Sequence, residues 1–576
     1  MNIRQYPLAH LGVTTSKQER YNSREFFFTP YTMKPAPLPM EHTVRKPVES
    51  SRAYNQRRKL VALAMLIALA LAIALAVILL GCGGSPAAFK PDPPPPVVAP
   101  LSATDVANLV QAAATSANAD TMAIAVVDRG GKVLAVYDKA GVLPGATDIG
   151  NFGNAVDVND LAVALARTGA YFSNDQAPLS SRTVRFISGI HFPPGVANAP
   201  TADLYGIENT NRGCTLSTNF LPGMAVNPSA SLAGGTGPGI LTGKSQLDDS
   251  DPNAVNPGGV PIFHNGVVVG GIGVAGVSHE VAEFAAFTAS ESSGFGLPNP
   301  LPDPGAVFIG GIALPFVNQA TRPAGVTAGT FNGGYLAGFN PIASTGQPPE
   351  GDLVAPTNGP MGGLTVAEVQ QILNNAEATA NTTRAAIRLP LGSRAKMVIA
   401  VADLDGTLIG LRRMVDSTVF SIDVAASKAR NMVYFNGPNR TTADLPGVPM
   451  GTAVTSRTIS FGSQPLFPPG INGSGNGPFF NLFLQDVQNP CTQGNQTGAP
   501  NNNKSGVVFF PGAVGLFKNG TLVGGLGISG DGVDQDDYVT AGGSVGFEAP
   551  TAIRADQIFI NGVRLPYFKF PRNPTF

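Results

Sequence analysis

The chain has 576 residues, and its 37 Lys and Arg residues almost balance its 38 Asp and Glu residues, which gives a net charge of −1. A nearly neutral chain without a basic stripe lacks the electrostatic footprint of nucleic-acid-binding proteins, so that class of function is excluded. The 69 Gly and 50 Pro residues exceed their usual combined share of about 12%, yet they stay below the roughly 25–30% that marks disorder. We therefore expect a globular protein that is rich in loops.

Residues 1–81 are expected to be a leader that contains a signal peptide. The basic run Arg57–Lys59 precedes 21 uninterrupted apolar residues, Leu60–Leu80. This order is typical of a signal peptide, although the apolar run is also long enough to span a bilayer. The end of the run, together with Gly81 and Cys82, resembles the lipobox of bacterial lipoproteins, in which the cysteine is acylated. An uncleaved signal anchor with a buried Cys82 is the alternative. Both interpretations predict export.

Residues 82–100 are expected to be a tether. The segment Lys90–Pro100 contains four consecutive prolines. Such a run favours a stiff polyproline II conformation, which suits a spacer that holds a folded domain away from a membrane.

The folded part of the chain is expected to be a duplication. The segments Ser181–Gly195 and Ser456–Gly470 are identical at nine of fifteen positions, and they lie 275 residues apart. A repeat at this distance is a whole domain, long enough to bury its own core. We place copy 1 in residues 101–290, a Gly- and Pro-rich linker or insertion in 291–363, and copy 2 with a C-terminal tail in 364–576.

The same elements are expected in the same order in both copies. Each copy begins with a capped helix, at Ser102 in copy 1 and at Thr365 in copy 2. A hairpin, a second helix, the repeated segment that ends in Phe-Pro-Pro-Gly, and a glycine-rich hairpin with an Asn-Gly turn then follow. We interpret the glycines of the last hairpin as sites of close packing rather than as a phosphate-binding loop. The expected strands and second helices are Met122–Asp128, Lys132–Tyr137, Leu161–Phe172 and Gly258–Gly276 in copy 1, and Met397–Asp403, Thr407–Leu411, Val424–Phe435 and Gly512–Gly530 in copy 2.

This order of elements resembles the GlcG/HbpS-type heme-binding domain family. The resemblance rests on the AIAVVD-G-G hairpin, the helix that contains ART, the FPPG segment and the VGGIGVAG strand, and on the acidic helix start Asp531–Asp537 in copy 2. It implies an α/β (α+β) fold of two tandem profilin-like sandwiches, each an antiparallel sheet flanked by helices. It also implies heme, or a related tetrapyrrole, as the ligand.

Several residues are candidates for tetrapyrrole contacts. Arg167 and Arg430 could pair with heme propionates, or carbonyls and solvent could satisfy them. Phe192 and Phe467 of the FPPG segments could face a porphyrin, although core packing is the alternative. Asp534, Asp536 and Asp537 could hold a cation, and interaction with a helix N-terminus is the alternative.

Histidine is the commonest heme-iron ligand, with Tyr among the alternatives. Of the five histidines, two precede the expected mature start and none lies in copy 2. His191 and His279 are the residues that we would test as iron ligands, and a structural role is the alternative for each. His264 is expected at an exposed turn. If histidine is not the ligand, Tyr171 and Tyr434 become the candidates.

Two cysteines lie in the folded part, Cys214 and Cys491, each about 20 residues after an FPPG segment. Corresponding positions in two copies could meet across a pseudo-twofold axis, and an exported protein permits oxidation, so we predict a disulfide between the copies. The alternative is that each is a small buried apolar residue.

Together these features predict an exported protein, lipid-anchored through Cys82 and periplasmic or at the cell surface, in which two copies form a pseudo-dimer within one chain. We favour a tetrapyrrole-binding protein over an enzyme. The alternatives are a heme-degrading or peroxide-dependent enzyme and a surface interaction module without a ligand.

Overall fold

The computed structural model describes residues 98–150, 153–199, 201–212, 214, 232, 256–298, 307–494 and 505–575. The predicted signal peptide and the predicted lipid site Cys82 lie outside these residues. Pro93–Phe576 form one compact unit, which contains both copies. None of the helices in the described ranges combines the length and the hydrophobicity that a membrane crossing requires.

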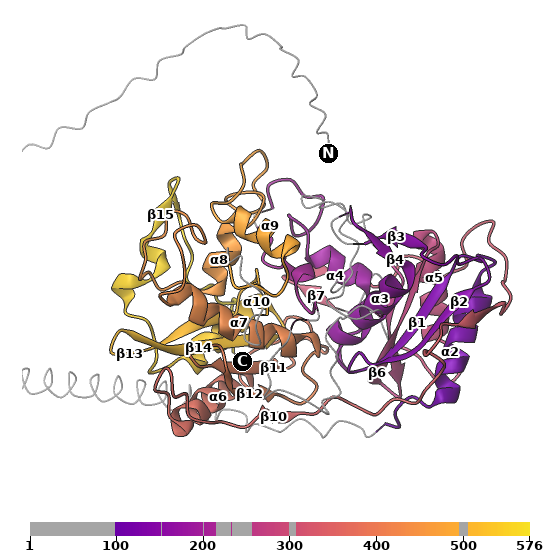
Figure 1. Cartoon of the computed structure of the whole chain (residues 1–576), viewed down its shortest axis with the longest axis horizontal. Coiled ribbons are helices and arrows are strands. Elements are labelled where there is room, and N and C mark those ends of the chain that lie inside the picture. Colours follow the sequence, from indigo (N-terminus) through magenta and orange to yellow (C-terminus); the bar gives the residue numbers. More distant parts are fainter. Residues whose placement is uncertain are drawn as a thin grey trace, which may run out of the picture. The chain divides into compact units, whose positions relative to one another are not determined.

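Each copy contains a five-stranded antiparallel sheet (Figure 1). The order is β5-β6-β1-β2-β9 in copy 1 and β13-β14-β11-β12-β10 in copy 2, so the four strands predicted for each copy have the same order in both. The predicted fold class is therefore confirmed. In copy 1 the strands are β1 (Ala123–Asp128), β2 (Val133–Lys139), β5 (Gly259–His264), β6 (Val267–Ala275) and β9 (Gly333–Tyr335). In copy 2 they are β11 (Met397–Ala402), β12 (Leu408–Arg413), β13 (Ala513–Lys518), β14 (Thr521–Gly530) and β10 (Gly351–Val354).

Helices cover both faces of each sheet. Ala123, Ala125 and Val127 of β1 share a core with α3, whereas Ile124 and Val126 share a core with α2 and α5, because successive strand residues point to opposite faces. In copy 2, α7 packs on one face and α6 and α10 lie on the other. The helices are α2 (Ala103–Ser116), α3 (Val158–Phe172), α4 (Ser181–Ile187), α5 (His279–Ser290), α6 (Val366–Ala380), α7 (Phe420–Asn436), α8 (Ser456–Gly462), α9 (Phe480–Gln488) and α10 (Val533–Gly543).

The predicted helix starts are present. Ser102 and Asp105 form a capping box on α2, and Thr365 and Glu368 form one on α6. The glycines of β6 and β14 allow close helix packing, as expected. A Cβ atom on Gly273 would overlap the carbonyl oxygen of Ala162 in α3, and the glycines of β14 approach α7 in the same way.

One hydrophobic core spans both copies. Residues of α3 and of α7 belong to the same buried cluster. The rings of Phe172 and Phe420 stack with their centroids 4.1 Å apart, and the backbone N–H of Val419 donates to the carbonyl oxygen of Tyr171 at 3.1 Å. We call the region where the two copies meet the seam.

The duplication extends into the segment predicted as a linker. Phe308–Phe316 resembles Phe559–Tyr567 at a constant offset of 251 residues. Both segments begin with a short hairpin, β7 (Phe308–Ile309) with β8 (Ile312–Ala313) and β15 (Phe559–Ile560) with β16 (Val563–Arg564). We call these two segments the tail hairpins.

The repeated Ser-Arg-Thr sequence holds the tail hairpins in place. In copy 1, the hydroxyl of Thr183 donates to the carbonyl oxygen of Pro315 at 2.6 Å. In copy 2, the hydroxyl of Thr458 donates to the carbonyl oxygen of Pro566 at 2.7 Å. The Ser-Arg-Thr sequence of the repeated segment therefore has a structural role, which is to anchor the tail hairpin of each copy.

A buried ion pair completes each anchor. Arg182 donates to both carboxylate oxygens of Glu283 on α5, at 2.7 and 3.1 Å. Glu283 also accepts the backbone N–H of Asn318, just after the tail hairpin, at 3.0 Å. The arrangement recurs in copy 2, where Arg457 pairs with Asp537 and Asp537 accepts the backbone N–H of Lys569 at 3.0 Å. We call this arrangement the clasp.

The aspartates at the start of α10 face cationic side chains. Asp534 lies 2.8 Å from a guanidinium nitrogen of Arg457, and Asp536 lies 3.0 Å from Nζ of the fully buried Lys428. Among the described residues there is no group of three or more residues suited to hold a metal ion. The possible cation site is therefore filled by the side chains of the protein itself.

Arg457→Met should destabilise the protein by about 3–5 kcal/mol, because it leaves the carboxylate of Asp537 buried without its cation. Lys569→Ala is the matched control. Its side chain pairs with Asp203 and Asp534 but is half exposed, so its loss should cost less than about 1 kcal/mol. Urea unfolding measures both effects, and equal losses would contradict a special role for the clasp.

Candidate functional site

The FPPG loops of the two copies lead into the seam. Asn472 follows the copy 2 loop, and its side-chain oxygen lies 2.7 Å from Nε2 of His191, which directly precedes the copy 1 loop. The same oxygen accepts the backbone N–H of Asn198 at 2.6 Å. In return, the backbone N–H of Asn472 donates to the side-chain oxygen of Asn198 at 2.8 Å. The residues that follow the two FPPG loops thus exchange hydrogen bonds between the copies.

Of the two histidines predicted as iron ligands, His191 lies in the seam. Its side chain is 5% exposed, and its Nδ1 atom is buried with no hydrogen-bond partner among the described residues. His279 instead lies exposed at the first position of α5. His264 is half-buried near a turn, with its ring 5.7 Å from that of Phe295. The structure therefore does not bring His191 and His279 into one described group of metal ligands.

Arg167 and Arg430 occupy corresponding positions and make the same contact. Nε of Arg167 donates to the carbonyl oxygen of Gly131 at 2.9 Å, and Nε of Arg430 donates to that of Gly406, also at 2.9 Å. Both glycines lie in the turn of the first hairpin, and both arginines are buried. Of the two interpretations given above, this geometry matches the one in which carbonyls satisfy the arginines.

Tyr171 and Tyr434 are buried within their own copies. The hydroxyl of Tyr171 lies 3.4 Å from the carbonyl oxygen of Gly130, and burial raises its pKa above the usual value. The hydroxyl of Tyr434 donates to the carboxylate of Asp444 at 2.9 Å.

Phe192 and Phe467 make equivalent contacts in the two copies. Phe192 meets Phe186 edge to face at 6.0 Å, and Phe467 meets Phe461 in the same way at 5.5 Å. Phe467 is buried and Phe192 is half-buried. Core packing, the alternative for these rings, is the contact that the structure shows.

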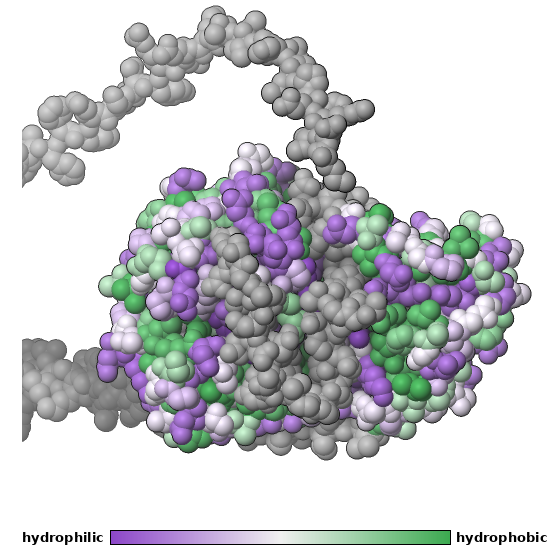
Figure 2. All heavy atoms as spheres, in the orientation of Figure 1, coloured by the Kyte–Doolittle hydropathy of each residue, from purple (hydrophilic) through white to green (hydrophobic). Residues whose placement is uncertain are grey.

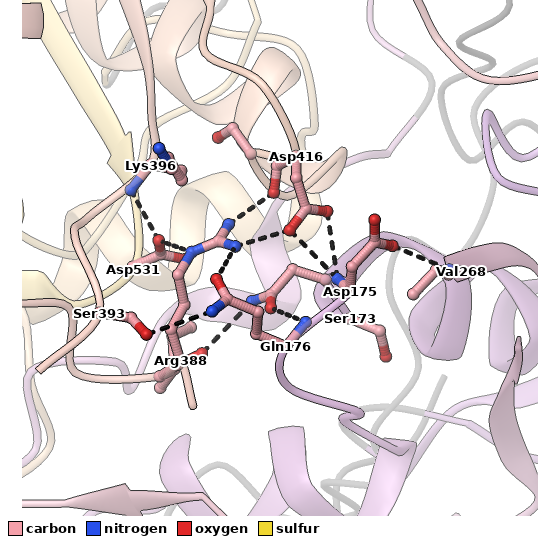
Figure 3. Close-up of polar contacts among 12 residues, drawn as sticks. Ser173, Asp175, Gln176, Val268, Arg388, Ser393, Lys396, Asp416 and Asp531 are labelled. Atoms are coloured by element: carbon pink, nitrogen blue, oxygen red, sulfur yellow. Dashed lines mark hydrogen bonds and ion pairs between the residues drawn. The ribbon is translucent and has the colours of Figure 1, made fainter. Parts of the chain in front are cut away.

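A charged network around Arg388 lies at another part of the seam (Figure 3). Arg388 is 1% exposed and donates to the carboxylates of Asp531 and Asp416, the latter at 2.6 Å. From copy 1, the backbone N–H of Asp175 donates to the carboxylate of Asp416 at 3.1 Å, and the side-chain oxygen of Gln176 accepts from Arg388 at 3.1 Å. A single arginine of copy 2 therefore joins three segments, one of which belongs to copy 1.

Sequence reasoning missed this network. Between α6 and β11, residues 381–396 form a segment that carries Arg388, whereas only residues 117–122 connect α2 and β1 in copy 1. The difference in length could have marked this segment as an insertion specific to copy 2. Its contacts depend on how the copies pack, which the sequence pattern does not reveal.

Three carboxyl groups at the seam have raised pKa values. Burial raises the pKa of Asp423 to about 6, although the carboxylate accepts the backbone N–H of Asn211 of copy 1 at 2.8 Å. Burial raises the pKa of Asp486, which accepts from the Asn209 side chain, to about 6. The pKa of Asp175 is raised to about 6 by burial and by the neighbouring Asp416.

The structure joins Cys214 and Cys491 in a disulfide across the seam, with their Cα atoms 5.3 Å apart. The surrounding chains also contact each other, because Arg212 donates to the backbone carbonyl oxygens of Asp486 and Val487 at 2.9 and 3.0 Å. In each copy the cysteine lies in the chain between the FPPG segment and the last hairpin, so the bond connects these two stretches.

Comparison with known proteins gives one match to a family. Residues 364–543 match the model of a family described as "Haem degrading protein HbpS-like". The match lies in copy 2. It confirms for this part of the chain the resemblance that the sequence motifs indicate. No curated protein matches the chain.

Two solved structures resemble part of the chain. Klebsiella pneumoniae protein ORFY is 19% identical over 32% of this chain and 92% of its own, with a TM-score of 0.22. The protein in a PduOC:heme complex is 24% identical over 33% of this chain and 97% of its own, with a TM-score of 0.21. At such TM-scores, neither similarity bears on the function of this chain.

The substitution Asp423→Asn should stabilise the protein more at pH 7.5 than at pH 4.5. The folded-state pKa of Asp423 is about 6, above the usual value, so its contribution to stability falls as the pH rises from about 4 to about 6. Asn carries no charge and keeps an oxygen for the Asn211 N–H, so we expect a gain of about 1–3 kcal/mol at pH 7.5. Urea unfolding at both pH values measures the gain. An equal effect at the two values would contradict the raised pKa.

Peptides that contain Cys214 and Cys491 should remain joined after proteolysis of the denatured, non-reduced protein, and should separate after reduction. Replacing both cysteines by Ser should lower stability by about 2–4 kcal/mol, because a long loop is no longer closed in the unfolded state. Mass spectrometry and urea unfolding provide the measurements. Free thiols at both positions in the non-reduced protein would contradict the disulfide.

Proposed function

We propose that this protein binds a tetrapyrrole, with heme as the first candidate, at the seam beside the copy 1 FPPG loop. The observation that carries the proposal is the match of residues 364–543 to a family described as haem-degrading. The sequence motifs that resemble the GlcG/HbpS-type family recur in copy 1, which supports the same ligand class for the pair.

The described residues include one side chain that fits the metal of such a ligand. His191 is buried, and its Nδ1 atom lacks a hydrogen-bond partner among the described residues. A buried polar atom without a partner costs free energy, and binding a metal would remove that cost. A bound heme would bring most of the ligands of its iron, so His191 could hold it as a single protein ligand.

The two copies contribute unequally to the proposed site. Leu466 occupies the position of His191 in copy 2, and copy 2 has no histidine. The half-buried Phe192 follows His191 and can offer an aromatic surface, whereas its counterpart Phe467 is buried. We therefore propose that copy 1 supplies the ligand and that copy 2 supplies the opposing side of the seam.

Export and attachment to a bacterial membrane through Cys82 remain part of this proposal. The disulfide supports export, because disulfides persist in oxidising compartments and are rare in the cytosol. The apolar run Leu60–Leu80 followed by Gly81-Cys82 supports the anchor.

Heme degradation is the second candidate, and the description of the matching family favours it. The two candidates differ in what happens after binding. Loss of the Soret band with time, in the presence of a reductant or of peroxide, would indicate degradation. A stable band would indicate binding alone.

Hemin titration of the purified full-length protein tests the proposal. We expect a saturable Soret band, and we expect His191→Ala to weaken binding at least tenfold and to shift the band, because the ligand to the iron is lost. His279→Ala is the matched control and should bind as the unchanged protein does, since His279 lies exposed on α5. Absence of saturable binding would contradict the function, and an unchanged spectrum for His191→Ala would exclude this ligand.

A further inference from the structure

The orientation of the Asn472 side chain follows from its surroundings. The backbone N–H of Asn198 lies 2.6 Å from one atom of the Asn472 amide group, and a backbone N–H can only donate. That atom must therefore be the carbonyl oxygen. Because the backbone N–H of Asn472 also donates to the side chain of Asn198, the asparagine pair is held from both ends.

The orientation of Asn472 determines which nitrogen of His191 carries a hydrogen. The same amide oxygen lies 2.7 Å from Nε2 of His191, and an oxygen without a hydrogen can only accept. Nε2 must then be the donor. A neutral imidazole has a single N–H, so Nδ1 of His191 carries a lone pair.

We propose that Asn472 of copy 2 is a positioning residue that fixes the tautomer of His191 in copy 1, so that Nδ1 is ready to bind one metal centre per chain. The proposal rests on the proposed function and names the arrangement behind it. Histidines that bind metals commonly donate their other N–H to an oxygen, which orients the ring. Here that oxygen comes from the other copy, so neither copy holds the complete site.

The metal ligands that the described residues offer limit the kind of metal centre that could bind at His191. Among the described residues no three potential metal ligands lie together. A metal that binds His191 alone among these residues would bring its other ligands itself, as the metal of a tetrapyrrole does. Since Leu466 stands at the corresponding position of copy 2, the expected stoichiometry is one ligand per chain.

The tautomer can be measured without any ligand. We would label the full-length protein with ¹⁵N-histidine and record long-range ¹H–¹⁵N spectra at pH 8, with His191→Ala providing the assignment. The expected result is the Nε2–H form for His191. Asn472→Asp, which keeps an acceptor oxygen, should preserve this form, whereas Asn472→Ala should populate both tautomers. An Nδ1–H form in the unchanged protein would overturn the proposal.

Asn198→Gly is the matched control. It removes the side chain of Asn198 but keeps the backbone N–H that orients Asn472, and glycine adopts the positive φ of 56° at this position readily. The His191 tautomer should remain Nε2–H in this variant. The same change of tautomer in Asn198→Gly and Asn472→Ala would overturn the specific role of Asn472.

Hemin titration then links the tautomer to the ligand. We expect Asn472→Ala to weaken hemin binding about tenfold and to broaden the Soret band, with rescue by Asn472→Asp and a ratio of one hemin per chain. Normal binding by Asn472→Ala would overturn this inference and leave the proposed function standing. Normal binding by His191→Ala would overturn the ligand assignment on which both depend.

Discussion

The clasp is the interaction on which the ends of both copies depend. An arginine at the start of a short helix, a carboxylate on the last helix and a backbone N–H just beyond the tail hairpin meet in copy 1 and again in copy 2. Charges buried in this way are costly unless each is paired and hydrogen-bonded. The N–H of the tail gives the carboxylate an additional partner. The tail hairpin of each copy is thereby fixed against the domain to which it belongs.

Around this shared feature the two copies have diverged. Copy 2 has the buried pair Lys428 and Asp536, and the corresponding residues of copy 1 are Leu165 and Ala282. Both members of the pair differ together, so this position is apolar in copy 1 and charge-paired in copy 2. On the surface shown in Figure 2, hydrophobic residues form several separate groups among hydrophilic ones.

The sequence predicted the elements whose patterns are local and strong. Capping boxes, Asn-Gly turns and the alternation of buried strands can be recognised within a few residues, and all of them are present in the structure. The tail hairpins were missed because each strand has only two residues, which is too short for an alternating pattern to be recognised. The partners of Arg167, Arg388 and Asn472 depend on tertiary packing, which no pattern of spacing encodes. The linker strands β9 and β10 contain glycine or only a few apolar residues, so their pairing is decided by the sheet edges that they cover.

Two neighbouring residues of the segment between the copies, Gln347 and Pro348, contact different copies. The side chain of Gln347 donates to the carbonyl oxygen of Val268 in copy 1, and the carbonyl oxygen of Pro348 accepts from Arg413 in copy 2. Shortly before this point the segment has supplied β9 to one sheet, and shortly after it supplies β10 to the other. At this point the connection is therefore held by both copies. A change in the angle between the two copies would have to break the hydrogen bonds of Gln347 or of Pro348.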